Sequence, residues 1–161
     1  MTIDEQLAII SADAACRVRP PEGEPRLESE HTLPSDVWRF YQLCGGIDLF
    51  PHRDYSPFVL PPGKVVLANP VLVGQRVEGD RSDSWYLLAH DGNGDYLALD
   101  CSRERAGWCY DSFHETHGLV GQTPVIAHSF AELHVRCYAN RGGYPYWLRA
   151  DFVPLGDAYD M

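Results

Sequence analysis

The chain has 161 residues, of which 45% are hydrophobic and 22% charged, a composition that is typical of a globular domain and argues against global disorder. Its 23 acidic and 13 basic residues give a net charge of −10. This disfavours direct binding to nucleic acid and to anionic membranes, because phosphate surfaces attract positive charge. No apolar run approaches the ~20 residues that cross a bilayer, and the first ten residues lack the basic start of a signal peptide. We therefore expect a cytoplasmic protein of one domain, residues 1–161, whose five cysteines stay reduced.

The first elements along the chain are a helix and an acidic connector. Thr2 and Glu5 have the spacing of a capping box, and apolar residues at steps of three and four predict a helix over residues 3–15. Residues 19–30 hold three prolines and four glutamates. They predict an exposed, proline-rich, acidic connector.

The next segment predicts a second helix and then little regular structure. Pro34 suits the first turn of a helix, and Gly45–Gly46 can adopt the left-handed conformation that ends one. Residues 47–50 are typical of a short strand. Four prolines argue against regular structure over residues 51–63, and residues 65–73 fit either a short helix or a strand interrupted by a proline.

The clearest local signal is a β-hairpin. Residues 85–89 are rich in strand formers, His90–Asp95 contain two glycines and an Asn-Gly step, and residues 96–100 resume the strand pattern. Residues 107–111 predict a third strand that follows a polar turn.

The last part of the chain predicts a helix and an ordered tail. Ser129 can cap a helix over residues 130–139. Residues 142–161 form an aromatic carboxy-terminal extension. Helices at both ends with antiparallel strands between them predict an α+β fold.

Two groups of residues have metal-binding character, and the first lies in the hairpin turn. Asp91, Asn93 and Asp95 match the start of a calcium loop. Tyr96 then stands where that loop needs glycine, and Ser102 stands where it needs a bidentate glutamate. The same pattern is typical of a turn, because Asp and Asn tolerate positive φ. We therefore predict a turn and no metal here.

The second group is the pair His114 and His117. On a helix the two imidazoles would share a face. Their spacing is not that of H-E-x-x-H, and no third ligand is evident. Asp111 lies three residues before His114, but a carboxylate this close in the sequence is common by chance. Two histidines at a polar loop or a helix end are the favoured interpretation, and a small metal-dependent hydrolase is the weakest alternative.

Catalytic motifs are missing from the chain. It has no G-x-S-x-G nucleophile elbow, no phosphate-binding P-loop and no G-x-G-x-x-G pattern. We predict a protein that is not an enzyme, with no catalytic residue and no cofactor.

Four segments, in chain order, resemble the SUKH superfamily, which includes the Smi/Knr-type fungal cell-wall regulators and many bacterial immunity proteins. They are similar to its LP-x-D helix with a small-residue turn, to its central hairpin whose second strand ends in Asp, to the strand after it and to its IA-x-SF-x-E-L final helix. The matching residues are Leu33–Tyr41 with Gly45–Gly46, Trp85–Asp100, Gly107–Asp111 and Ile126–Leu133. The resemblance covers residues 33–138. It implies an α+β fold with a central, mostly antiparallel sheet flanked by helices, and neither catalytic residues nor a cofactor.

The resemblance also implies a function. In bacteria it implies a protein that binds and neutralises a polymorphic toxin, often a nuclease. In fungi it implies an adaptor or regulator that binds an endogenous protein. Many nuclease toxins carry basic clefts, and an acidic protein complements them and associates with them rapidly. We expect contact through the hairpin tip and the connector, although the connector also fits a solvated loop. These residues are Asp91, Asp95, Glu22, Glu24, Glu28 and Glu30.

Overall fold

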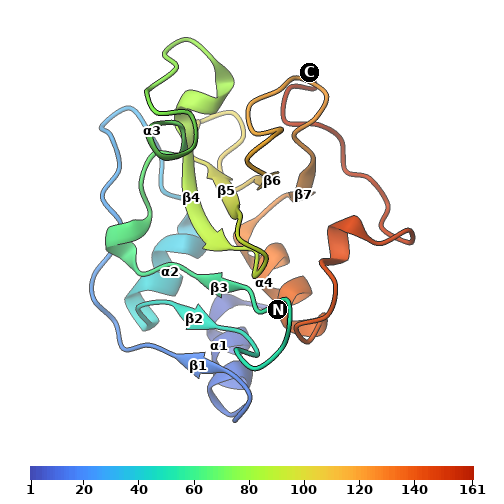
Figure 1. Ribbon diagram of the computed structural model, residues 1–161. Coiled ribbons are helices and arrows are strands. Elements are labelled where there is room, and N and C mark those ends of the chain that lie inside the picture. Colours follow the sequence, from blue (N-terminus) through green and yellow to red (C-terminus); the bar gives the residue numbers. More distant parts are fainter.

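One antiparallel sheet organises the protein, whose residues 1–161 are all described by the computed structural model. Its seven strands lie in chain order, and each strand pairs with the next along the sequence (Figure 1). The strands are β1 (Arg17–Val18), β2 (Ile47–Asp48), β3 (Phe58–Val59), β4 (Trp85–His90), β5 (Tyr96–Asp100), β6 (Cys109–Ser112) and β7 (Val125–Ala127). The predicted α+β fold with a central antiparallel sheet is confirmed.

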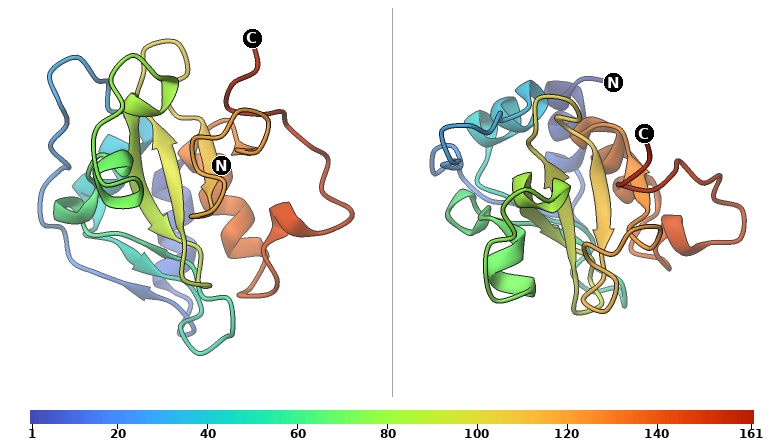
Figure 2. Two further views of the ribbon diagram at one scale, coloured as in Figure 1. Left: turned by 45° about the horizontal axis from the view of Figure 1, so that its top comes forward. Right: turned by 90° about the horizontal axis from the view of Figure 1, so that it is seen from above.

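Helices flank both faces of this sheet. Helices α1, α2 and α4 pack together on one face, and α3 lies on the other (Figures 1 and 2). They are α1 (Ile3–Ser11), α2 (Ser35–Leu43), α3 (Ala68–Leu72) and α4 (Phe130–Ala139). Three short 3₁₀ helices are also present, η1 (Pro62–Lys64), η2 (Arg81–Ser84) and η3 (Tyr146–Leu148). None of the helices has both the length and the apolar character that crossing a membrane requires.

One part of the core lies between the sheet and the group of three helices, and Ala68 of α3 extends the core to the other face. Phe40 of α2 packs edge-to-face on Phe130 of α4, with ring centroids 4.9 Å apart, and both side chains are fully buried. Asp36 of α2 accepts the backbone N–H of Ala131 at 2.9 Å. This hydrogen bond caps the first turn of α4 with a residue of α2, so the two helices hold each other in register.

The predicted hairpin is confirmed, and so is the turn interpretation of its D-x-N-x-D pattern. Asp91 Oδ1 accepts the backbone N–H groups of Asn93 at 2.7 Å and Asp95 at 3.0 Å. Gly92 and Gly94 have φ of 82° and 92°, a conformation that glycine adopts without strain. The carboxylate of Asp91 is therefore used to build the turn.

Both predicted helix caps are confirmed. The hydroxyl of Thr2 accepts the N–H of Glu5 at 3.2 Å, and the Glu5 carboxylate accepts the N–H of Thr2 at 2.9 Å. Ser129 Oγ accepts the N–H of Glu132 at 3.1 Å, and α4 spans the predicted residues.

Two predictions about local structure were wrong. The first helix ends at Ser11 rather than at residue 15, because the side chain of Asp13 accepts the N–H of Ala15 at 2.9 Å and starts a turn. Residues 51–63 contain β3 at Phe58–Val59 and also η1. This two-residue strand exists because it is hydrogen-bonded on both sides, to β2 and to β4.

The ambiguous segment, residues 65–73, contains the helix α3. Pro70 is its third residue, where the backbone N–H has no partner within the helix, so a proline is tolerated. The strands predicted over residues 47–50 and 107–111 are present with shifted ends, as β2 and β6.

The carboxy-terminal extension, residues 142–161, runs along β7. Asp157 forms an isolated bridge with Pro124, and Val125 donates its N–H to the carbonyl of Gly156 at 2.9 Å. The extension therefore covers part of a sheet edge that would otherwise expose unpaired backbone groups.

Candidate protein-binding surface

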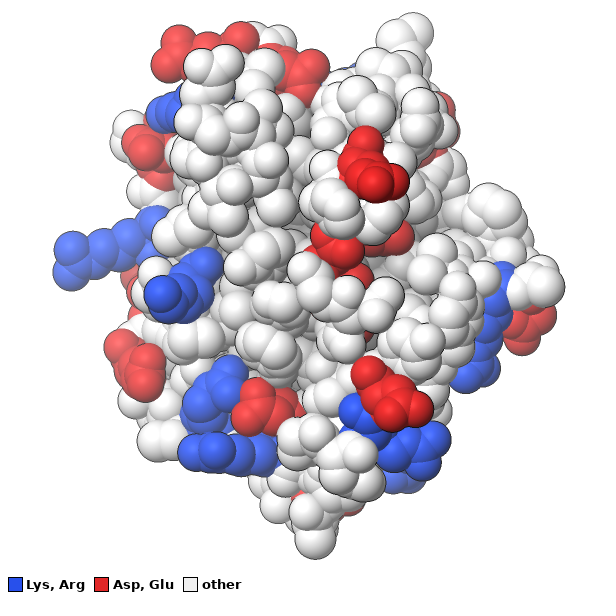
Figure 3. Space-filling model, in the orientation of Figure 1, with Lys and Arg blue, Asp and Glu red and all other residues white.

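The sheet face that carries α3 has an exposed apolar ridge. Val66 precedes α3 and Val71 lies within it, and these residues are 40% and 52% exposed. We call the pair the valine ridge. Figure 3 shows this side of the molecule, where uncharged atoms form a broad area over α3 and β4 and charged side chains lie around it. Exposed apolar side chains that lie together on one face are a candidate binding site.

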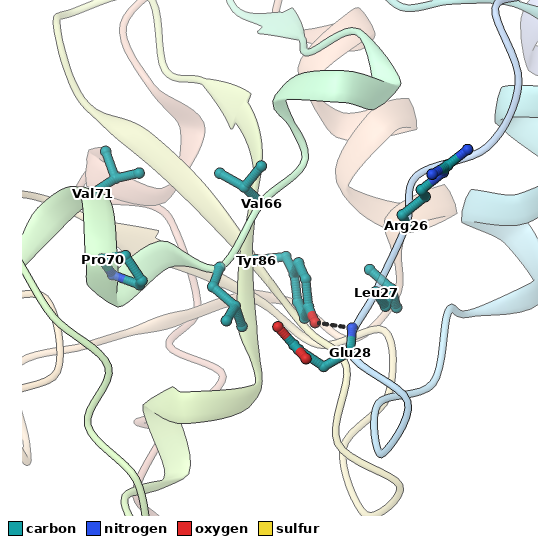
Figure 4. A pocket seen from close by; sticks show the side chains of 8 residues that line it. Arg26, Leu27, Glu28, Val66, Pro70, Val71 and Tyr86 are labelled. Atoms are coloured by element: carbon teal, nitrogen blue, oxygen red, sulfur yellow. Dashed lines mark hydrogen bonds between the residues drawn. The ribbon is translucent and has the colours of Figure 1, made fainter.

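A first hollow of about 450 Å³ lies between the ridge and the connector. Pro70 and the valine ridge form one wall, Leu27 of the connector lies opposite, and Tyr86 of β4 stands between them (Figure 4). Arg26 and Glu28 stand on the connector side. The hollow is thus an apolar depression with charged groups at one margin, which is how ligand-binding and partner-binding depressions are commonly built.

A second hollow of about 600 Å³ lies on the other side of the ridge. Phe58 of β3, Leu87 of β4 and Tyr96 of β5 contribute to its lining, together with Lys64 of η1. Tyr96 directly follows the hairpin turn. The valine ridge therefore lies between the end of the connector and the end of the hairpin that carries the turn.

The connector is fixed to the sheet by Tyr86. The phenol oxygen accepts the backbone N–H of Glu28 at 2.9 Å and lies 2.7 Å from Nδ1 of His31. The phenol also carries a proton of its own, and the imidazole is within hydrogen-bond distance of it. Burial raises the pKa of Tyr86 to about 12, so the phenol keeps this proton at neutral pH. The wall of the first hollow is thereby held in place before any partner binds.

A cluster of charges closes one margin of the first hollow. Arg76 makes two hydrogen bonds with Asp83, at 2.8 and 3.2 Å. Its guanidinium is also 3.8 Å from Glu28 and 3.6 Å from Glu30, which are longer distances than hydrogen bonds require. One cation therefore faces three carboxylates, and the two glutamates are only weakly compensated.

The six acidic residues that we predicted as partner contacts fall into two groups, exposed glutamates and buried aspartates. The connector glutamates Glu22, Glu24, Glu28 and Glu30 are exposed, and two of them, Glu28 and Glu30, reach Arg76 beside the first hollow. Glu22 lies elsewhere, next to Gly45.

The two hairpin aspartates are placed differently from the glutamates. Asp91 and Asp95 are buried, and Asp95 accepts hydrogen bonds from the backbone N–H of His114 and pairs with its ring, both at 2.9 Å. Asp111 lies nearby; burial raises its pKa to about 6, and the negative charges of Asp91 and Asp95 act in the same direction. These carboxylates contribute negative potential at the hairpin while their oxygens are already bonded.

The two histidines considered as metal ligands are engaged separately. His117 is buried, with Nε2 at 2.7 Å from the side-chain oxygen of Asn69 and Nδ1 at 3.1 Å from Ser112 Oγ. Burial lowers its pKa to about 4. His114 is exposed and pairs with Asp95. No three His, Cys, Asp or Glu side chains are grouped closely enough to hold a metal ion.

The valine ridge and the role of Tyr86 were missed by the sequence analysis. Val66 and Val71 belong to an apolar stretch that could equally have been core. Their exposure follows from how α3 sits on the sheet, and the sequence offers no local signal for that.

Comparison with known proteins identifies the family. No family model matches the chain, and no solved structure matches it. The immunity protein YokJ of Bacillus subtilis (strain 168) is 44% identical over 160 residues, which cover 99% of this chain and 97% of that protein. Such identity along the whole length leaves no element of the fold outside the match. The chain therefore belongs to the family of the Bacillus subtilis immunity protein YokJ.

Proposed function

We propose that this protein is a bacterial immunity protein, which neutralises a cognate toxin by binding it and not by an enzymatic reaction. The observation that carries this proposal is the 44% identity to a protein named as an immunity protein, over nearly the whole of both chains. The sheet flanked by helices agrees with the SUKH resemblance of residues 33–138, and we propose that the family falls within that superfamily.

For the toxin we propose a nuclease domain with a basic cleft, met in the cytoplasm. The net charge of −10 supports this, because an acidic protein is attracted to a phosphate-binding cleft and blocks it by occupying it. We propose that the contacts include acidic residues of the connector and the hairpin. The exposed glutamates are suited to direct pairing, and the buried Asp91 and Asp95 are suited to adding negative potential.

The test is rescue and binding with the toxin domain encoded beside this gene. Cells that express the toxin domain should survive only when this protein is co-expressed, and the two chains should co-purify. Added salt should slow their association far more than it speeds dissociation, since exposed charges steer the encounter and are screened by salt. If the protein neither binds nor rescues against any adjacent-gene product, the immunity function is wrong and an adaptor function takes its place.

A further inference from the structure

We propose that the toxin docks on the valine ridge and the first hollow, through an apolar segment flanked by Arg or Lys residues. This inference rests on the proposed function and assigns it a surface and a partner chemistry. It also narrows the six acidic candidates to Glu28 and Glu30.

The apolar part of the argument is the exposure of the ridge beside a preformed hollow. Val66 and Val71 are 40% and 52% exposed, and the hollow beside them is lined mostly by apolar side chains. Its connector wall is anchored through Tyr86. A partner that inserts an apolar side chain here buries hydrophobic surface without first having to order the wall, and preorganisation of this kind increases affinity.

The charged part of the argument is the imbalance at the margin. Asp83 holds Arg76 by two hydrogen bonds, whereas Glu28 and Glu30 stand 3.8 and 3.6 Å away with side chains 49% and 57% exposed. Even with Arg26 counted, three carboxylates face two guanidiniums. Basic residues of a partner can therefore pair with the two glutamates while its apolar side chain enters the hollow. An apolar centre with a charged rim is the usual anatomy of a protein interface.

A rival apolar groove lies on the opposite side of the sheet, between α1 and α4. Ile9 and Val135 are exposed there. Its neighbouring carboxylates are already bonded, because Asp4 pairs with Arg39 at 2.6 Å and Glu5 caps its own helix. None of the residues that line this groove is acidic, so it provides a matched control.

The first experiment compares Val71→Asp with Val135→Asp, which place the same charge on exposed valines of opposite faces. Binding to the adjacent-gene toxin domain is measured by surface plasmon resonance, and folding is checked by thermal melting. We expect Val71→Asp to weaken binding at least about tenfold, as loss of an interface anchor does, and Val135→Asp to leave it unchanged. The paired variants Glu28→Gln/Glu30→Gln and Glu22→Gln/Glu24→Gln then test the charges, and only the first pair should slow association several-fold.

The second experiment is independent of any loss of stability. A photo-crosslinking amino acid replaces Val71 or, as the control, Val135, and the crosslinked toxin peptide is identified by mass spectrometry. We expect crosslinks from position 71 alone, to an apolar residue with Arg or Lys close by in the toxin.

The outcomes separate the two proposals. A toxin that binds the wild-type protein and crosslinks from position 135, or to a segment without basic residues, overturns the inference and leaves the immunity function standing. Crosslinking of position 71 to a second copy of this chain, with toxin binding unaffected, overturns it as well. A toxin domain that does not bind the wild-type protein overturns both.

Discussion

The phenol oxygen of Tyr86 accepts the backbone N–H of Glu28 at 2.9 Å, which joins the central hairpin to a connector 58 residues away in the sequence. The same phenol reaches His31 at 2.7 Å. One side chain thus fixes the segment that carries two of the exposed glutamates, and it also stands inside the first hollow.

The variant Tyr86→Phe should release this segment. It removes two hydrogen bonds, and at about 0.5–1.5 kcal/mol each it should lower the free energy of unfolding by about 1–3 kcal/mol. The amide proton of Glu28 should also exchange with solvent faster, which hydrogen-exchange NMR measures. Tyr144→Phe, at an exposed tyrosine, is the control and should change stability by less than about 0.5 kcal/mol. Unchanged exchange at Glu28 in Tyr86→Phe would show that the connector is held by other contacts.

The two glycines of the hairpin turn should differ in their tolerance of alanine. Both have positive φ, which costs an alanine about 1–2 kcal/mol. A Cβ at Gly94 meets nothing within 4 Å, but one at Gly92 would lie 2.6 Å from the backbone N of Ser56 and 2.7 Å from the carbonyl carbon of Tyr55. We expect Gly94→Ala to lower the free energy of unfolding only by this conformational cost. Gly92→Ala should lower it clearly more, because the added Cβ also meets the backbone, and urea unfolding measures both losses. Equal losses would mean that the loop before β3 moves aside freely.

The elements that the sequence predicted correctly are those with local chemical signals. The hairpin has its turn residues, and α1 and α4 have side chains that cap their own first turns. The strands β1 and β3 had no such signal. Each is two residues long and exists only through pairing with other strands of the sheet. Neither the positions of prolines nor the periodicity of apolar residues reveals such pairing.

The candidate site was predicted only in part, for a similar reason. The connector glutamates were expected to be exposed, and they are. The aspartates of the hairpin were expected at the surface, but the ability to bond nearby backbone N–H groups that makes Asp91 a turn residue also occupies its carboxylate. The exposure of Val66 and Val71 depends on the placement of α3, which is a tertiary property.

Asp100 should be one of the most sensitive positions in the core. Its buried carboxylate accepts hydrogen bonds from Tyr110 at 2.5 Å, Trp85 at 3.2 Å and Ser102 at 2.9 Å, and it pairs with Arg105 at 3.2 Å. Asparagine would remove the negative charge that pairs with Arg105. Its side-chain NH₂ group would also face hydrogen-bond donors where the carboxylate oxygen had accepted their hydrogen bonds. Breaking a buried ion pair in this way typically costs about 3–5 kcal/mol, so Asp100→Asn should lower the urea midpoint strongly. A loss below about 1 kcal/mol would contradict this account.

Replacement of Asp111 should have the opposite effect to replacement of Asp100, because the folded protein disfavours the charge of Asp111. Burial, with Asp91 and Asp95 nearby, raises its pKa from 3.8 to about 6, although Trp147 donates an N–H to it at 3.1 Å. The folded state therefore binds this proton more tightly than the unfolded state. The stability that the proton contributes is complete below pH 4 and is lost as the pH rises through 6.

Asp111→Asn should consequently stabilise the protein at neutral pH. Asparagine stays neutral and keeps a side-chain oxygen for Trp147. At about 1.4 kcal/mol per pKa unit, the gain above pH 7 should be at most about 3 kcal/mol and should shrink toward zero near pH 4. Urea unfolding of both proteins at several pH values between 4 and 7.5 measures it.

The comparison between variant and wild type isolates Asp111 from the other titrating groups. Burial lowers the pKa of His117 and of His134 to about 4, so both proteins lose stability as the pH falls below 6.5, where the unfolded state begins to bind more protons. This loss cancels in the difference between them. Asp151→Asn, at an exposed aspartate, should give a difference that does not vary with pH. If Asp111→Asn gives the same flat profile, the carboxyl of Asp111 is ionised without penalty in the folded protein, and the acidic hairpin is more open to solvent than its burial indicates.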